Sequence, residues 1–298
     1  MNIQSLSFMV ALAAVLTVST TRADLVRFIW NGAGDGVDFA DPANWGGEAA
    51  NGTNLPGDAV DTGAADASNV IMQMGGTPST SVSAPFAPAS PFDILIVRNG
   101  HTLNLTADFD LTGIPTLLGQ TGTGSLLNLS AGTFTTAGVT VGGGADGTLN
   151  LLGTGSLVAA GISVNGNSTL RLSGSASTAS ATSLAVDSGS SLEFFFGPTG
   201  VNSVGLSGAF NITPGALLMV DGSGYLGGPG TIDLVSFSGN TGSFADPADI
   251  TLNGFTGLNP TIGYDASRMF LSLTAIPEPS TWALLLVGGA ALTLRRRR

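Results

Sequence analysis

The sequence predicts an all-β protein built as a parallel β-helix (β-solenoid), with coils of about 22 residues. Three observations predict this fold: a repeat of nearly constant length, an alternation of apolar and small polar residues within each repeat, and glycine-rich turns between the apolar segments. We expect an N-terminal cap module before the coils. We also expect an N-terminal signal helix and a C-terminal hydrophobic helix at the ends of the chain.

Leucine residues mark the repeat. The leading leucines of five successive segments lie at positions 103, 126, 149, 170 and 192, so the repeat length is nearly constant. Val139, Ile162 and Leu184 form a second series, and Phe134 and Leu157 form a third. We therefore expect three short strands per coil, with apolar side chains aligned along the axis. An antiparallel meander or sandwich also alternates, but the fixed period favours the solenoid.

Residues 24–91 differ from the repeats and are predicted to form an N-terminal β cap module with a linker. Trp30, a glycine-rich loop, the segment from Phe39 to Trp45 and then Pro56-Gly57-Asp58 follow one another. This order resembles the start of many exported bacterial repeat proteins, some of which carry autotransporter-type repeats. We expect Trp30 and Trp45 to close the end of the solenoid. Residues 76–91, rich in Pro, Ser and Ala, are expected to form an extended connection to the β-helix repeats of residues 92–200.

Residues 201–276 are predicted to form irregular coils and cap strands. Ala216–Val220 and Thr231–Phe237 have the pattern of strands separated by glycine-rich turns. Arg268–Leu273 is predicted to be the last strand, with Thr261–Tyr264 as its hairpin partner. A cap is expected here because an open solenoid end exposes unpaired strand edges and invites aggregation.

Residues 1–23 have the features of a secretory signal peptide. The apolar run Ser5–Val18 follows a short polar start, and Thr21 and Ala23 are small enough for signal peptidase to cleave after Ala23. The chain has no Cys, so its fold does not depend on the redox state of the compartment, which is consistent with export.

Residues 277–298 contain three elements in a defined order. They are the triplet Pro277, Glu278 and Pro279, the apolar segment Trp282–Leu294, and the membrane-stop cluster of Arg295, Arg296, Arg297 and Arg298. As a helix the apolar segment spans about 20 Å, which is short of a ~30 Å hydrocarbon core. The positive-inside rule places the arginines in the cytoplasm and the preceding chain outside.

This array resembles the PEP-CTERM sorting signal of Gram-negative bacteria. The resemblance implies that residues 277–298 are recognised by an exosortase, a membrane protease-transpeptidase, which removes the tail. It also implies transient insertion into the inner membrane through the short C-terminal helix, followed by delivery to the cell surface or the extracellular matrix. The alternative is a plain tail anchor behind a proline-rich hinge.

Composition excludes several kinds of chemistry. The absence of Cys and Lys and the presence of a single histidine, His101, exclude thiol catalysis, a Walker-type phosphate loop, a lysine Schiff base and any site that needs two imidazoles. Residues 24–276 contain 4 Arg and 19 acidic residues, so their formal charge is 4 − 19 = −15. Such a surface repels nucleic acid, and no nucleic-acid partner is expected.

Few residues suggest a ligand site. Asp35, Asp38 and Asp41 lie in a glycine-rich loop, where they would either bind calcium or form Asx-turns. The run Gly142–Gly147 is predicted to be a coil turn. Trp30 and Trp45 could also stack on sugar rings, although packing in the cap is favoured.

Two further features resemble parts of a catalytic site. Asp108 and Asp110 flank Phe109 and should point outward if Phe109 points inward, as a carboxylate pair in a polysaccharide-active enzyme would. His101 is expected to be a turn residue that faces solvent. We predict no catalytic residue, metal or cofactor.

The favoured hypothesis is an exported, non-enzymatic β-solenoid with a structural, adhesive or biofilm role. Its expected partners are signal peptidase, an exosortase and extracellular polysaccharide. The second hypothesis is a surface-displayed β-helix carbohydrate-active enzyme, which a groove with clustered acidic and arginine residues would support. An autotransporter passenger is disfavoured because no C-terminal barrel pattern follows the repeats.

Overall fold

The computed structural model describes residues 26–46, 70–75, 79–88, 93–122, 124–244 and 246–276. The predicted signal peptide with its cleavage site after Ala23, the Pro-Glu-Pro triplet, the C-terminal apolar segment and the four terminal arginines lie outside these residues.

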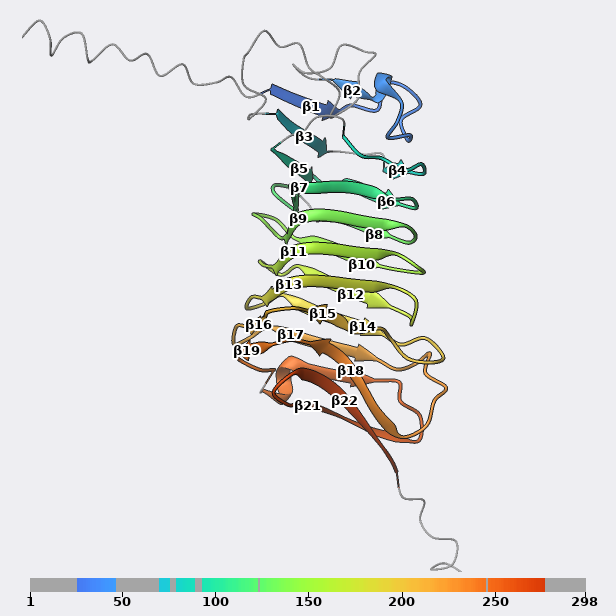
Figure 1. The fold of residues 1–298 in the computed structure, drawn as a ribbon, viewed down its shortest axis with the longest axis vertical. Helices are drawn as coiled ribbons and strands as arrows, with labels where there is room; N and C mark the ends of the chain where they lie inside the picture. The colour runs from blue at the N-terminus through green and yellow to red at the C-terminus, as the bar shows by residue number, and fades with distance from the viewer. Residues whose placement is uncertain are drawn as a thin grey trace, which may run out of the picture.

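Two sheets stack their strands along one axis and form a column, with β1 at one end and β21 and β22 at the other (Figure 1). In order, the first sheet contains β2 (Trp45–Gly46), β1 (Val26–Trp30), β3 (Val70–Gly75), β5 (Ile94–Arg98), β7 (Phe109–Leu118), β9 (Thr133–Val141), β11 (Ser156–Val164), β13 (Thr178–Val186), β15 (Val204–Leu206), β18 (Gly230–Ser236), β22 (Arg268–Ala275) and β21 (Leu258–Tyr264). Next to β13, β16 (Ala209–Ile212) and β19 (Gly239–Thr241) continue the same sheet.

The second sheet contains β20 (Ile250–Asn253), β17 (Leu217–Asp221), β14 (Ser191–Phe195), β12 (Thr169–Ser173), β10 (Gly147–Leu151), β8 (Ser125–Leu129), β6 (Thr102–Leu105) and β4 (Thr80–Val82). Two short 3-10 helices, Pro42–Asn44 and Pro247–Asp249, complete the described elements.

The register confirms a parallel β-solenoid of about six turns with coils of about 23 residues. Ile162 pairs with Val139 on one side and Leu184 on the other, as the second apolar series predicts. Phe134 and Leu157 are also register partners. Every pairing from β3 through β15 is parallel, so the antiparallel alternative is wrong for the repeats.

One leucine of the first series is assigned differently by the structure. Leu127, not Leu126, pairs with Leu103 and Leu149 and is fully buried, whereas Leu126 pairs with Thr102 and Thr148 and is half-exposed. A slip of one position moves a side chain to the opposite face of the sheet. Leu127 is separated from Leu103 by more residues than from Leu149. Leu126 is equally far in sequence from both, so a search for a constant period selects Leu126.

From β6 to β14, each coil contains two strands rather than three. The second and third predicted segments belong to one long strand, for example β11, which pairs along its length with β9 and β13. The chain turns sharply at the corners. Gly142 has a φ of 88°, and a Cβ there would collide with the carbonyl oxygen of Asn165 in the next coil, so this corner requires glycine.

The coils extend beyond the clear sequence repeat. Upstream, β3 pairs in parallel with both β1 and β5. The strand β4 lies within residues 76–91, which the sequence predicts as an extended connection, and pairs with β6. Downstream, β17 pairs with β14 and β20 pairs with β17. Longer loops there lengthen the coils without breaking the parallel register.

The N-terminal cap is aromatic, as predicted. Trp30 and Trp45 are buried, with exposed fractions of 4% and 3%. Their rings meet edge to face at 5.2 Å between centroids, and Phe39 packs against Trp45 at 5.1 Å. The indole N–H of Trp45 donates to the Phe39 carbonyl. These contacts support packing in the cap as the role of both tryptophans.

The C-terminal cap contains the predicted hairpin, in which β21 pairs antiparallel with β22, and β22 pairs antiparallel with β18. Arg268 connects these elements. Its Nη1 donates to Asp233 Oδ1 at 2.6 Å, its Nε donates to Asp265 Oδ2 at 2.7 Å, and its guanidinium lies over the Phe270 ring. The Arg268 side chain and the Ser267 backbone N–H lower the pKa of the Asp265 carboxyl to about 2 from its ordinary 3.8.

Leu127→Ala should lower the free energy of unfolding by about 2–5 kcal/mol, because it leaves a cavity in a closely packed column. The matched control is Leu126→Ala in the neighbouring position, which should have a much smaller effect because that side chain faces outward. Chemical denaturation of both variants measures the difference. Equal losses would contradict the register.

The ion pairs of Arg268 predict acid sensitivity in the C-terminal cap. The pKa of Asp265 is lower in the folded state, so its stabilising contribution is complete above about pH 4 and is lost as the pH falls towards 2. Asp265→Asn should therefore lower the Tm at pH 7, and the difference from the unmodified protein should disappear near pH 2. A difference that stays constant with pH would contradict this assignment.

Candidate functional site

The sorting motif begins directly at the C-terminal end of the solenoid. The strand β22 ends at Ala275, and the backbone N–H of Ile276 donates to the Gly257 carbonyl at 3.2 Å. Ile276 is 54% exposed and precedes Pro277 in the chain. The cap is therefore followed by the Pro-Glu-Pro triplet without a further folded element between them.

The connection between the cap and the apolar segment is short. Only five residues, 277–281, separate Ile276 from Trp282. Because a residue extends by at most about 3.6 Å, these five residues span at most about 18 Å. The solenoid end containing β21 and β22 is thus held close to the start of the apolar segment, whatever conformation the five residues adopt.

The aspartates of the N-terminal loop accept hydrogen bonds from their own loop. Asp35 Oδ1 accepts from the N–H groups of Val37 and Asp38 and from Asn44 Nδ2, and these bonds lower the pKa of Asp35. Asp38 Oδ1 accepts from Ala40 N, and Asp41 accepts from Ala43 N and Asp35 N. The loop therefore has the Asx-turn geometry that was the alternative to calcium binding.

Asn44 organises this loop from the inside. Its buried amide donates to Asp35 and to the Asp38 carbonyl, and it accepts from the N–H groups of Gly34 and Gly36. Within the described segments, no group of three or more His, Asp or Glu side chains is placed to hold a metal ion.

Asp108 and Asp110 are exposed and flank the buried Phe109, as predicted. Each carboxylate is engaged locally. Asp108 Oδ1 accepts from Thr133 N in the next coil at 2.8 Å, and Asp110 Oδ1 accepts from both the N–H and the hydroxyl of Thr112. These hydrogen bonds stabilise the corner of a coil and the start of β7.

The expectation that His101 faces solvent is wrong. Its side chain is fully buried, its Nε2 lies 2.8 Å from Thr80 Oγ1, and its ring is 6.2 Å from that of Trp30. Successive coils place Ser125, Gly147, Ser168 and Ser190 at the equivalent buried position, at or directly before the start of each strand of the second sheet. The alternation along the strand could have identified this inward position, because His101 and Leu103 point to one side and Thr102 points to the other.

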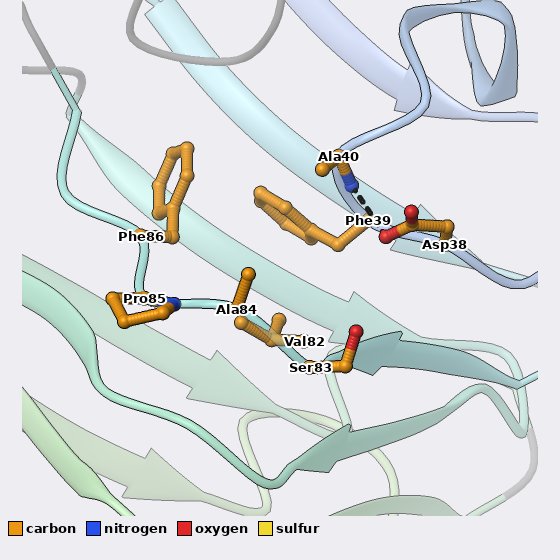
Figure 2. A pocket seen from close by; sticks show the side chains of 8 residues that line it. All are labelled: Asp38, Phe39, Ala40, Val82, Ser83, Ala84, Pro85 and Phe86. Atoms are coloured by element: carbon orange, nitrogen blue, oxygen red, sulfur yellow. Dashed lines mark hydrogen bonds between the residues drawn. The ribbon is translucent and has the colours of Figure 1, made fainter.

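A shallow pocket lies where the N-terminal cap meets the first coil (Figure 2). It has a volume of about 140 Å³ and is lined by Asp38, Phe39, Ala40, Val82, Ser83, Ala84, Pro85 and Phe86. The Phe39 and Phe86 rings meet edge to face at 4.7 Å, and Asp38, the one charged lining residue, bonds to Ala40 N. The lining offers apolar contact and no pair of groups suited to acid–base chemistry.

None of the helices among the described residues is long and apolar enough to cross a membrane. The apolar segment Trp282–Leu294 lies outside those residues.

Comparison with known proteins identifies the tail. A family model described as the PEP-CTERM protein-sorting motif matches residues 275–298. Neither a curated protein nor a solved structure matches the chain. The chain therefore carries a PEP-CTERM sorting motif on a β-solenoid, and the motif implies an exported cell-surface protein that is processed by exosortase.

Asn44→Ala should lower the free energy of unfolding by roughly 2–4 kcal/mol, since four hydrogen bonds of about 1 kcal/mol each are lost. Because the three carboxylates already accept hydrogen bonds within the loop, the Tm of the unmodified protein should be equal in EDTA and in millimolar calcium. A rise in Tm with calcium that Asp35→Asn abolishes would contradict the Asx-turn assignment.

Proposed function

We propose that the mature chain is a non-enzymatic structural component of the cell surface or extracellular matrix, with an adhesive or biofilm role. One observation carries the proposal: the sorting motif is attached directly to the capped end of a solenoid rod. A rod of this kind can act as a scaffold or spacer once it has been delivered to the cell surface or matrix and attached there.

The dimensions of the rod support this role. Twelve strands follow one another along the first sheet, and at about 4.8 Å per strand they extend roughly 50 Å. In our proposal the β21–β22 end lies next to the membrane before processing, and the aromatic cap points away. Signal peptidase removes residues 1–23, and exosortase then removes residues 277–298.

We propose no enzymatic activity for the chain. The alternative, a carbohydrate-active enzyme on a β-helix, depended on Asp108 and Asp110. Both carboxylates accept hydrogen bonds from neighbouring Thr residues, which favours a structural role for them. Both aspartates are exposed, and β7 contains no acidic residue beyond Asp110.

Fractionation of producing cells with and without exosortase tests the sorting step. With exosortase, we expect a tail-less protein at the surface or in the matrix. Without it, full-length protein should accumulate in the membrane fraction. A triple alanine variant of Pro277, Glu278 and Pro279 should reproduce the loss, whereas Thr281→Ala outside the triplet should be processed normally. Soluble, full-length protein in both strains would contradict the proposal.

A further inference from the structure

Charge is distributed unevenly along the solenoid. Residues 24–276 carry 19 acidic residues, yet residues 111–186 contain only two ionisable side chains, Asp146 and Arg171. Arg171 is paired with Glu193 at 2.7 Å on the second sheet. The strands β9, β11 and β13 of the first sheet contain no charged residue.

The outward side chains of these three strands form what we term the neutral face. Its members are small, and most carry a hydroxyl: Thr133, Thr135, Ala137, Thr140, Ser156, Val158, Ala160, Ser163, Thr178, Ser180, Thr182 and Ala185. They stand in register, so that Thr135, Val158 and Ser180 form one row across the strands, and Thr140, Ser163 and Ala185 form another. Asp110 in the neighbouring strand β7 pairs with Thr135, and Asp187 directly follows the end of β13.

Several hydroxyls on this face are free to bind a ligand. Thr178 donates to Ser156, and Ser180 donates to the Leu157 carbonyl. Across the described residues, Thr135, Thr140, Ser163 and Thr182 make no side-chain hydrogen bond to another residue. Their hydroxyls alternate with the exposed methyl groups of Val158 and Ala160, so the face offers both hydrogen bonds and apolar contact.

We infer that the neutral face binds an uncharged polysaccharide, which lies across successive strands. This inference rests on the proposed surface role and specifies the partner. The formal charge of −15 over residues 24–276 disfavours anionic polymers, and a face without charged residues can bind a neutral polymer with no charged group losing its hydration. The row of Thr133, Ser156 and Thr178 carries a hydroxyl on each strand at a spacing of about 4.8 Å, which suits a ligand that itself repeats.

The composition of the face also defines how binding depends on ligand length. The face carries no aromatic side chain, so each sugar is held by hydroxyl and methyl contacts without stacking on a ring. Each such contact is weak, and the affinity comes from many contacts made by one polymer. Long or insoluble chains should therefore be retained, and short oligosaccharides should compete poorly.

Co-sedimentation of the full chain, purified in mild detergent, tests the inference with three insoluble neutral polysaccharides: cellulose, chitin and mannan. The anionic control is alginate made insoluble by covalent cross-linking, in calcium-free buffer. We expect the protein to sediment with at least one neutral polysaccharide and to stay in solution with the cross-linked alginate. Failure to sediment with all three, or equal retention on alginate, would overturn the inference.

Two matched double variants test whether the polysaccharide binds at the neutral face. Thr135→Asp with Ser180→Asp adds charge on either side of Val158 and should reduce sedimentation at least tenfold. Thr102→Asp with Thr148→Asp is the control, because these residues lie on either side of Leu126 in the equivalent outward row of the second sheet. Equal losses in the two variants would overturn the assignment.

Folding of each variant is checked by its Tm. If the double variant on the neutral face does not fold, Ala160→Asp at an exposed position makes the same test. The outcome is separable from the sorting proposal. If the protein is sorted normally but does not bind neutral polysaccharide, only the inference about the neutral face is overturned. If it binds polysaccharide but is not processed by exosortase, only the proposed sorting step is overturned.

Discussion

The structure depends on in-register parallel pairing between coils. Each strand can satisfy its backbone groups only through the coil above and the coil below, so each residue is placed over its equivalent in the next coil. This constraint produces the buried columns, such as Leu127 between Leu103 and Leu149. It also aligns the outer surface, where Asn128 accepts from Asn150 and donates to Asn104 at 2.9 Å each.

The parts of the fold that could be predicted from the sequence are those with an undisturbed period. Val139, Ile162 and Leu184 fall at nearly equal intervals, and the structure aligns them. Leu126 and Leu127 are adjacent leucines, and only the alignment of Asn104, Asn128 and Asn150 distinguishes the inward one. Beyond Leu192 the steps to Leu218 and then to Ile250 become longer, because loops interrupt the period while the pairing continues.

The candidate sites differ in how much of each could be predicted from the sequence. The sorting motif is a linear pattern, so the comparison with known families could identify it directly. The role of His101 depends on the column of buried residues it joins, and the role of Asp35 depends on its contact with Asn44, which lies further along the chain. The neutral face could not be found from a motif because its members come from three coils and share only their small size and the absence of charge.

The position of β22 determines how the rod responds to force. Tension applied through residue 276 reaches β22 first, and this strand is paired on both sides, with β21 and with β18. Two ladders of hydrogen bonds must therefore open before β22 detaches. A terminal edge strand is held by a single ladder and would detach more easily. The cap thus acts as a mechanical clamp at the end where the chain is attached.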